Sequence, residues 1–232
     1  MGMYWYWILF IGIAVVSWLV QWNFKSKFKK YSRMSLDNGM TGKDVAEKML
    51  RENGIHDVQV KMTNGVLTDN YNPTNRTISL SKDVYSTNSV AAAAVAAHET
   101  GHAIQHAKAY GPLKMRSALV PVVSFSSQWV TWILLGGMLL LGNGSGIGST
   151  VLLIGICLFA MITLFSFVTL PVEINASQRA LAWLNIAGIT NSFNDSAAKG
   201  ALKAAAYTYI VAALSSLATL LYYIMIFLGR RD

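Results

Sequence analysis

Four long apolar runs dominate the pattern of hydrophobic and polar positions along the chain. They cover residues 4–22, 119–141, 147–172 and 207–228, and none of them contains a charged side chain. An α-helix of about 20 apolar residues is long enough to cross the hydrocarbon core of a bilayer. The pattern therefore predicts a mainly α-helical membrane protein with one transmembrane helix for each run.

The first run is predicted to be a retained membrane anchor. A cleaved signal peptide begins with a basic segment and ends at a cleavage site of small residues, and neither is visible in this sequence. Tyr4, Trp5, Tyr6 and Trp7 stand at one end of the run and Trp18 and Trp22 at the other, as aromatic residues do at the two surfaces of a bilayer. Five basic residues follow it directly: Lys25, Lys27, Lys29, Lys30 and Arg33.

These basic residues have two interpretations. One is a patch that binds lipid or nucleic acid. The other, which we favour, is the enrichment of Lys and Arg on the cytoplasmic side of a membrane anchor. All of the 19 lysines and arginines except Arg230 and Arg231 lie in residues 25–116 and 173–206. We therefore expect both polar segments in the cytoplasm, the N-terminus outside, and no nucleic-acid partner.

The segment between the first two runs mixes helix and strand patterns. Residues 41–54 carry an apolar stripe at helical spacing, with Thr41 as the N-cap. Residues 58–67 alternate around the tight-turn signal Asn64-Gly65, which predicts a β-hairpin. Residues 76–80 predict another short strand, which either belongs to the core or pairs with an extended substrate by strand addition.

Residues 98–102, His-Glu-Thr-Gly-His, carry the strongest chemical signal. They lie in the alanine-rich segment 90–105, which is predicted to be helical because Ala is the best helix former. Residues four apart share one face of a helix, so His98 and His102 can bind one metal ion. Glu99 can then reach a water on that metal as a general base, which is the arrangement of a zinc peptidase.

The surroundings of the motif support a helix. Its N-cap is expected at Thr87, Asn88 or Ser89, and Gly111-Pro112 is expected to end it. The alternative is a buried helix whose histidines only satisfy hydrogen bonds, but such a helix would not need Glu99 at this spacing.

A catalytic zinc usually takes three protein ligands. Glu173, one of four glutamates, follows the third apolar run on the side predicted for His98, so it is the preferred third ligand. The alternative is that Glu173, just after Pro171, only marks a helix end. His106 shares the face of the motif histidines but lies one turn too far, which predicts a neighbouring or packing role. A zinc held by Glu173 would lie close to the membrane surface.

Composition agrees with the pattern of apolar runs. The chain of 232 residues is 53% hydrophobic and 13% charged, and its mean hydropathy is +0.40. Soluble domains carry about 25% charged residues. The single cysteine, Cys157, lies in the third run, so no intramolecular disulfide can form.

Four stretches resemble the YugP-like family of bacterial membrane zinc metallopeptidases, and the resemblance covers nearly the whole chain. It implies a gluzincin, in which two histidines and a glutamate hold zinc, with distant similarity to HtpX-type membrane proteases. It implies His98, His102 and Glu173 as ligands and Glu99 as general base. The stretches are 67–73 (Leu-Thr-Asp-Asn-Tyr-Asn-Pro), 96–105 (Ala-Ala-His-Glu-Thr-Gly-His-Ala-Ile-Gln), 170–177 (Leu-Pro-Val-Glu-Ile-Asn-Ala-Ser) and 204–209 (Ala-Ala-Ala-Tyr-Thr-Tyr).

The chain departs from these families at two places. Asn70 and Asn72 stand where the family often has His and Asp, and Ser177 stands where HtpX-type enzymes have an Asp that orients a zinc histidine. Candidates for supporting the metal ligands or for donating to the oxyanion of the reaction are His106, Asn175, Ser177, Arg179 and Tyr110.

The expected fold is four transmembrane helices plus a small α+β zincin-like catalytic domain that contains the motif helix. The predicted divisions are an N-terminal transmembrane anchor (1–24), a cytoplasmic zincin-like domain (25–118), a transmembrane hairpin (119–172) turning at 142–146, a cytoplasmic segment with the third zinc ligand (173–206) and a C-terminal transmembrane helix (207–232).

The predicted function is that of a zinc metalloendopeptidase in the bacterial plasma membrane. It would cleave peptides or membrane proteins near the cytoplasmic surface, in a role such as membrane-protein quality control; the lipid bilayer is a partner, and self-association is left open. One alternative is a catalytically silent, zinc-binding scaffold or chaperone, which would not need Glu99. An intramembrane protease would need its motif in a spanning helix, and residues 90–105 are too short and polar. A transporter would need charged residues within the spans.

Overall fold

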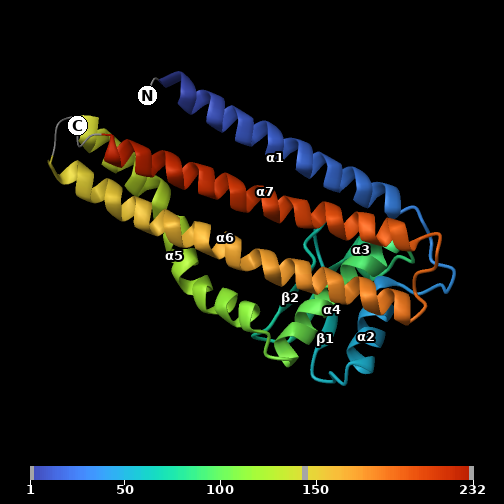
Figure 1. Cartoon of the computed structure of the whole chain (residues 1–232). Helices are drawn as coiled ribbons and strands as arrows, with labels where there is room; N and C mark the ends of the chain where they lie inside the picture. Colours follow the sequence, from blue (N-terminus) through green and yellow to red (C-terminus); the bar gives the residue numbers. More distant parts are fainter. Residues whose placement is uncertain (1–2, 143–145, 230–232) are drawn as a thin grey trace. The chain divides into compact units, whose positions relative to one another are not determined.

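The computed structural model describes residues 3–142 and 146–229, which are mostly helical and include one small sheet (Figure 1). In chain order the elements are α1 (Met3–Tyr31), α2 (Gly42–Glu52), β1 (Gln59–Thr63), β2 (Asn70–Asn72), β3 (Thr77–Ser81), α3 (Lys82–Tyr85), α4 (Val90–Ala107), α5 (Gly111–Gly142), α6 (Gly146–Ile186) and α7 (Asp195–Leu228).

Within the described residues, four helices are long and apolar enough to cross a membrane: α1, α5, α6 and α7. This confirms the number of spans predicted from the apolar runs. The helix of the His-Glu-Thr-Gly-His motif, α4, is not among them. Most of the predicted turn at 142–146 falls on residues 143–145, outside the described part of the chain, as do Arg230 and Arg231.

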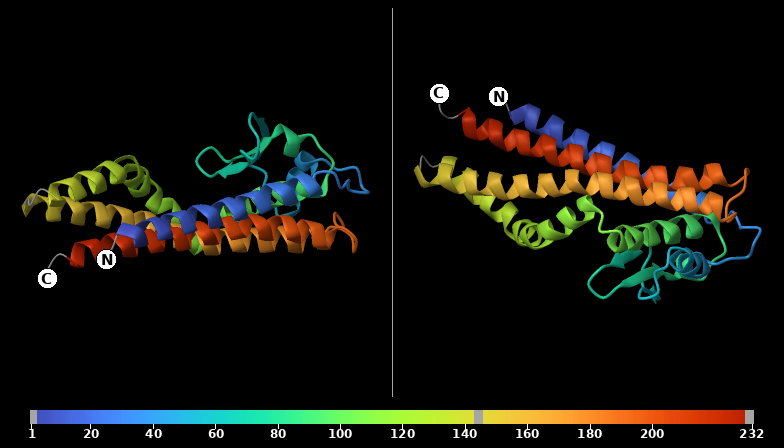
Figure 2. Two further views of the ribbon diagram at one scale, coloured as in Figure 1. Left: turned by 90° about the horizontal axis from the view of Figure 1, so that it is seen from above. Right: turned by 60° about the horizontal axis from the view of Figure 1, so that its bottom comes forward.

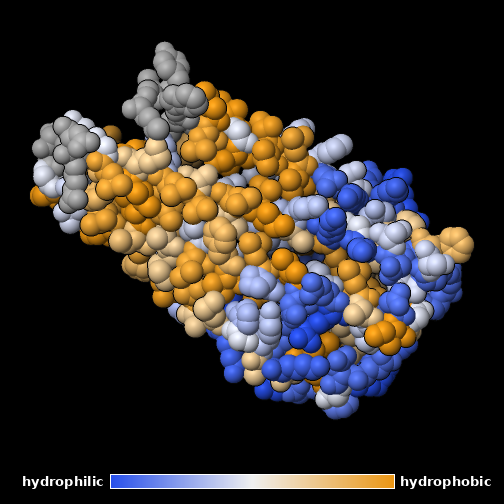
Figure 3. All heavy atoms as spheres, viewed as in Figure 1, coloured by the Kyte–Doolittle hydropathy of each residue, from blue (hydrophilic) through white to orange (hydrophobic). Residues whose placement is uncertain are grey.

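The chain forms two compact units. One comprises residues 1–113 and 171–208, and the other comprises residues 114–170 and 209–232. In the space-filling view, hydrophilic residues gather over α2 and β1, whereas hydrophobic residues cover most of the visible surface of the long helices (Figure 3). A surface of that kind suits contact with lipid.

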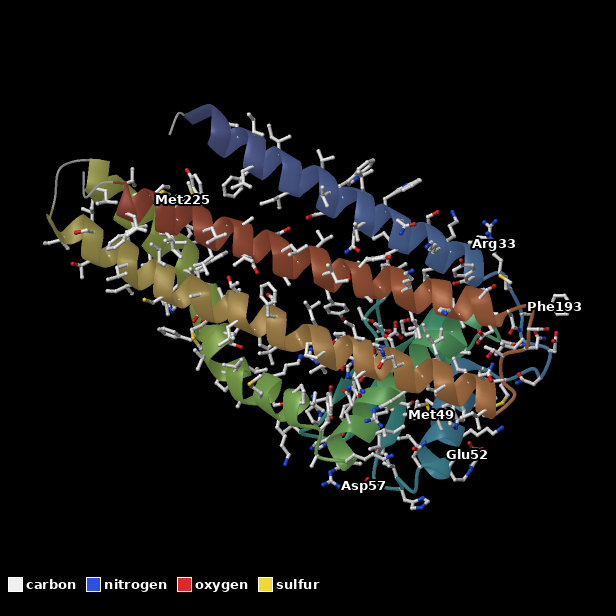
Figure 4. All side chains as sticks on the ribbon, viewed as in Figure 1. Arg33, Met49, Glu52, Asp57, Phe193 and Met225 are labelled. Carbon is white, nitrogen blue, oxygen red and sulfur yellow. The ribbon has the colours of Figure 1, made fainter. Side chains whose placement is uncertain are left out.

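The first unit has its own hydrophobic core, formed by α2, β3, α3, α4, the C-terminal part of α6 and the N-terminal part of α7. Trp183 of α6 is tied to α2, because its indole Nε1 donates a hydrogen bond to Oε2 of Glu52 at 2.7 Å. Figure 4 labels Glu52 on α2 and Phe193 in the loop between α6 and α7. The second unit has a core of Val130, Leu134, Leu141, Leu152 and Ile156.

Helix α2 begins where the sequence predicts. The Thr41 side chain accepts a hydrogen bond from the backbone N–H of Asp44, and the Asp44 carboxylate accepts one from the backbone N–H of Thr41. Two backbone N–H groups that the helix leaves without partners are thereby satisfied reciprocally. Thr41 is therefore confirmed as the N-cap.

The sheet is built differently from the predicted hairpin. The strand order is β1-β3-β2; β1 pairs in parallel with β3, and β2 pairs antiparallel with β3. The predicted pairing across Asn64-Gly65 is therefore wrong, and the hairpin is formed by β2 and β3 instead. Asn72 supports that turn, because its Oδ1 accepts hydrogen bonds from the backbone N–H groups of Thr74 and Asn75.

The position of β3 decides between the two interpretations of residues 76–80. Strands flank β3 on both sides, and four of its five residues are buried. A strand whose N–H and C=O groups are already paired on both sides has no edge for a substrate. The core-strand alternative is the one observed.

Pro112 and Pro171 were each considered as markers of a helix end, but both lie within helices. Gly111-Pro112 does not close the motif helix, since α4 ends at Ala107 and these residues open α5. Proline is tolerated in the first turn of a helix, where its missing N–H would have no partner. Helix α6 likewise continues through Pro171 to Ile186, so Glu173 lies within a helix rather than after one.

Candidate metal centre

Helix α4 presents the motif from the interior of the first unit. The side chain of Ser89 caps it by accepting a hydrogen bond from the backbone N–H of Ala92 at 3.1 Å, so Ser89 is the N-cap among the three candidates. Its alanines are buried almost throughout, and α4 lies between the sheet and the C-terminal part of α6 in both views of Figure 2. Small side chains let the flanking elements come close.

Helices α4 and α6 approach each other closely at Gly101. A Cβ atom added to Gly101 would lie 2.8 Å from the carbonyl oxygen of Ala176 and 3.2 Å from its Cα. Only glycine fits at this position without moving one of the two backbones. The contact brings His98, three residues before Gly101, and His102, the residue after it, up to the stretch of α6 that contains Glu173.

Three side chains converge at this contact. The Nε2 atoms of His98 and His102 lie 3.2 Å and 3.6 Å from the same carboxylate oxygen, Oε2 of Glu173. One ligand atom from each of the three residues lies within 4.8 Å of the others. His98 and Glu173 are 75 positions apart in the sequence, and the fold brings them into contact.

The spacing of these atoms suits a zinc ion. Zinc binds His nitrogen and carboxylate oxygen at about 2.0–2.1 Å. In a tetrahedral site, these bond lengths place the ligand atoms about 3.3 Å from one another. The observed distances of 3.2 Å and 3.6 Å bracket that value. Two imidazoles and one carboxylate also leave a fourth position open, which a catalytic site needs for water.

The outer nitrogen of each histidine also has a partner. Nδ1 of His98 lies 3.1 Å from the hydroxyl Oγ of Ser177, and Nδ1 of His102 lies 3.0 Å from Oε1 of Gln105. Partners at Nδ1 turn Nε2 of both rings toward Glu173, and such contacts orient metal-binding histidines. Ser177 thus touches a histidine from the position where HtpX-type enzymes have an aspartate.

Glu99 is buried beside the three residues, with 9% of its surface exposed. Burial raises the pKa of its carboxyl, and the nearby His98 and His102 act in the opposite direction. Burial lowers the pKa of His102, but the Glu173 carboxylate, together with Glu99 and Gln105, more than reverses this effect.

Comparison with known proteins shows which family the chain belongs to. The family described as "Putative neutral zinc metallopeptidase" matches residues 6–228 of the chain. The chain belongs to this family. It is also 43% identical over 226 residues to "Putative membrane protease YugP" of Bacillus subtilis (strain 168), an alignment that covers 97% of this chain and 98% of that relative. No solved structure matches the chain.

Family membership confirms three of the predictions from sequence. The chain is a relative of a protein described as a "Putative membrane protease", it belongs to the zinc metallopeptidase family named above, and zinc is the metal to be held. His98, His102 and Glu173 form a group that can hold it. Their roles as ligands and that of Glu99 as base remain predictions, which are taken up below.

The other candidate residues divide between two places. Asn175 and Arg179 join the network around the histidines, since Nε of Arg179 donates a hydrogen bond to Oδ1 of Asn175 at 2.7 Å. His106 is exposed and turned away to the sheet, where its Nδ1 lies 2.7 Å from the hydroxyl of Tyr71. Tyr110 follows the end of α4, and its backbone N–H donates to the carbonyl of Gln105.

The sequence alone did not single out Gln105 or Asp69. Gln105 lies three residues after His102, a spacing at which side chains on a helix meet, and this spacing could have drawn attention to it. Asp69 has no such local signal. Its carboxylate accepts hydrogen bonds from the backbone N–H and the hydroxyl of Ser81, a residue 12 positions later.

Proposed function

We propose that this protein is a membrane-embedded zinc metalloendopeptidase of the gluzincin type. His98, His102 and Glu173 hold the metal, and Glu99 is the general base. The observation that carries the proposal is the convergence of two histidine Nε2 atoms on one carboxylate oxygen, with a buried glutamate beside them. A zincin-like catalytic domain, formed by α4 with the sheet and α2, is part of the proposal.

The proposed reaction is hydrolysis of a peptide bond. When bound, zinc lowers the pKa of a water and polarises the peptide carbonyl. Glu99 accepts the proton of the attacking water on its carboxylate and delivers it to the nitrogen of the leaving amine.

The proposed place of cleavage is the cytoplasmic surface of the plasma membrane. Glu173 follows directly on the apolar run of α6, which supports a metal centre close to the bilayer. The concentration of lysines and arginines in residues 25–116 and 173–206 supports a cytoplasmic side. Substrates anchored in or lying on the membrane, including damaged membrane proteins, suit such a centre.

The test compares wild type with Glu99→Gln, purified in detergent. We expect roughly one zinc per chain in both proteins, because Glu99 is not a proposed ligand. We expect wild type to cleave a disordered protein such as casein, and Glu99→Gln to cleave it 10²–10⁴-fold more slowly, roughly the contribution of a general base. Zinc is measured by atomic absorption and cleavage by gel, with a chelated and zinc-reconstituted sample as control.

Two results would contradict the proposal in different ways. Zinc in both proteins with no cleavage by either, also for membrane-anchored peptides, would favour the zinc-binding scaffold or chaperone. Zinc that fails to bind wild type even after reconstitution would refute the metal site itself.

A further inference from the structure

The most deeply buried polar group at the metal centre is the side-chain amide of Gln105. Gln105 is 0% exposed and lies on α4, three residues after His102. An amide taken out of water costs free energy unless its hydrogen bonds are replaced. The fold replaces three of them: Oε1 contacts Nδ1 of His102 at 3.0 Å, and Nε2 donates to the carbonyl of Val172 at 2.8 Å and to Oδ1 of Asn175 at 3.0 Å.

The orientation of this amide is fixed by neighbouring groups that can either only donate or only accept a hydrogen bond. The carbonyl oxygen of Val172 can only accept, so it must face the NH₂ group of Gln105. Arg179 can only donate, so the atom of Asn175 that faces its Nε must be the oxygen Oδ1, and that oxygen also faces Gln105. Both contacts place the NH₂ of Gln105 toward α6, which leaves Oε1 toward His102.

The orientation determines where His102 carries its proton. Oε1 of Gln105 only accepts, so Nδ1 of His102 is the N–H that donates to it. In the neutral ring the lone pair is then on Nε2, the atom 3.6 Å from Oε2 of Glu173. A histidine binds metal through that lone pair. Ser177 alone does not fix which nitrogen of His98 carries the proton, because a hydroxyl can both donate and accept a hydrogen bond.

Gln105 also joins the two helices that supply the proposed ligands. Its Oε1 holds His102 on α4, and its Nε2 holds the carbonyl of Val172, the residue before Glu173 on α6. The contact with Val172 crosses the interface at which Gly101 meets Ala176, and the contact with His102 lies within α4. A shift of α6 relative to α4 would break one of them.

We propose that Gln105 is a positioning residue for the metal centre, which holds His102 in the tautomer with its proton on Nδ1 and is itself oriented from Arg179 through Asn175. The proposal rests on the ligand set proposed above. In this proposal, Asn175 and Arg179 of α6 help to hold His102 in the tautomer that binds zinc.

The main experiment measures zinc affinity by competition with a chromophoric chelator. The variants are Gln105→Met, which keeps the shape of the side chain but removes its acceptor and donors, and Gln105→Glu, which keeps an acceptor for His102. We expect Gln105→Met to bind zinc about 10–100-fold more weakly than wild type, as losing a partner of a metal-binding histidine typically does. Gln105→Glu is expected to recover part of that loss.

Ser89→Ala is the matched control. It removes the N-cap of the same helix, nine positions before His98, and is expected to lower the Tm without changing zinc affinity. His102→Ala separates the two proposals. If His102→Ala binds zinc as wild type does, the ligand set is wrong; if it loses zinc while Gln105→Met keeps wild-type affinity, only the role of Gln105 is overturned.

A second measurement does not depend on any variant folding. The chain has four histidines, so ¹⁵N NMR of histidine-labelled protein can resolve each ring. In metal-free wild type, above the pH at which the rings are protonated, the proposal expects His102 with its proton on Nδ1. A proton on Nε2 would overturn the proposal.

Discussion

At the scale of single residues, the protein holds a third carboxylate, the half-buried Asp69, near Glu99 and Glu173. Asp69 lies between β1 and β2, and its Oδ1 accepts hydrogen bonds from the backbone N–H of Ser81 at 2.7 Å and from its hydroxyl at 3.1 Å. Burial raises the pKa of Asp69, and the two Ser81 donors oppose this without reversing it. The contact fastens the segment before β2 to the end of β3.

The raised pKa makes the stability contribution of Asp69 depend on pH. Between the ordinary pKa of an aspartate, about 3.9, and its raised value, the folded state binds more protons than the unfolded state. Stability from this group is therefore present at acid pH and is lost as the pH rises through the folded-state pKa. We expect the Tm of wild type, relative to Asp69→Asn, to fall as the pH is raised from about 4 to 8.

Thermal unfolding in detergent at a series of pH values checks this prediction. Asparagine keeps an oxygen for Ser81 and has no charge, so the comparison isolates the titration of Asp69. A wild-type advantage that grows with pH would show that the Ser81 hydrogen bonds, and not burial, dominate the pKa.

The two asparagines at which the chain departs from its family have local roles in the structure. Asn70 donates a hydrogen bond to the carbonyl of Thr68, and Asn72 accepts from two backbone N–H groups of the β2–β3 turn. Tyr71, which lies between them, faces His106. Both asparagines therefore act locally, in the loop before β2 and in the β2–β3 turn.

At the scale of elements, the metal centre depends on how closely two helices approach. Gly101 of α4 lies against the backbone of Ala176 on α6, where an added Cβ would be 2.8 Å from a carbonyl oxygen. A helix backbone cannot yield as the end of a flexible side chain can. We expect Gly101→Ala to push α6 away from α4, to destabilise the protein by about 1–3 kcal/mol and to weaken zinc binding.

The matched control is Gly136→Ala in α5. An added Cβ at Gly136 meets nothing within 4 Å, so this variant is expected to be neutral or slightly stabilising, since Ala favours a helix over Gly. The Tm and the zinc affinity of both variants are measured side by side. Equal zinc affinity of Gly101→Ala and wild type would mean that the ligands do not need this approach.

Elements were predicted well from sequence where their signal is local. The N-cap at Thr41 and the helical run through the motif need only residues that are neighbours along the chain. The pairing of β1 is not local, because its partner β3 lies 18 positions further on, with Gln59 opposite Thr77. Alternation of polar and apolar residues marks a strand but does not name its partner, which is why the hairpin prediction failed.

At the scale of the whole molecule, the distribution of charge predicts the orientation in the membrane. The proposed topology places residues 25–116 in the cytoplasm and both chain ends outside. In a Cys157→Ala background, we expect a cysteine introduced at the exposed Asn64 to react with a membrane-impermeant maleimide only after the cells are permeabilised. Alkaline phosphatase fused after residue 232 is expected to be active.

Labelling of the Asn64→Cys protein in intact cells would reverse the proposed orientation. The two reporters are independent, since one lies in the segment after β1 and the other is added at the C-terminus. Disagreement between them would show that the number of membrane crossings between residue 64 and the C-terminus is not the three predicted.

The sequence by itself determined the features that depend on composition and short spacing. Apolar length gave the four candidate spans, and the His-Glu-Thr-Gly-His spacing gave a helix face with two imidazoles and a glutamate beside them. These properties need only the geometry of one helix, 1.5 Å and 100° per residue, which is the same in every protein.

Only the tertiary structure decided which distant groups meet the motif. Glu173 was preferred from sequence, but its contact with both histidines, the hydrogen bonds of Gln105 to Val172 and Asn175, and the central place of β3 each join segments far apart in the chain. Such contacts follow from how closely two backbones can pack, here at Gly101 and Ala176, and no local pattern records that distance.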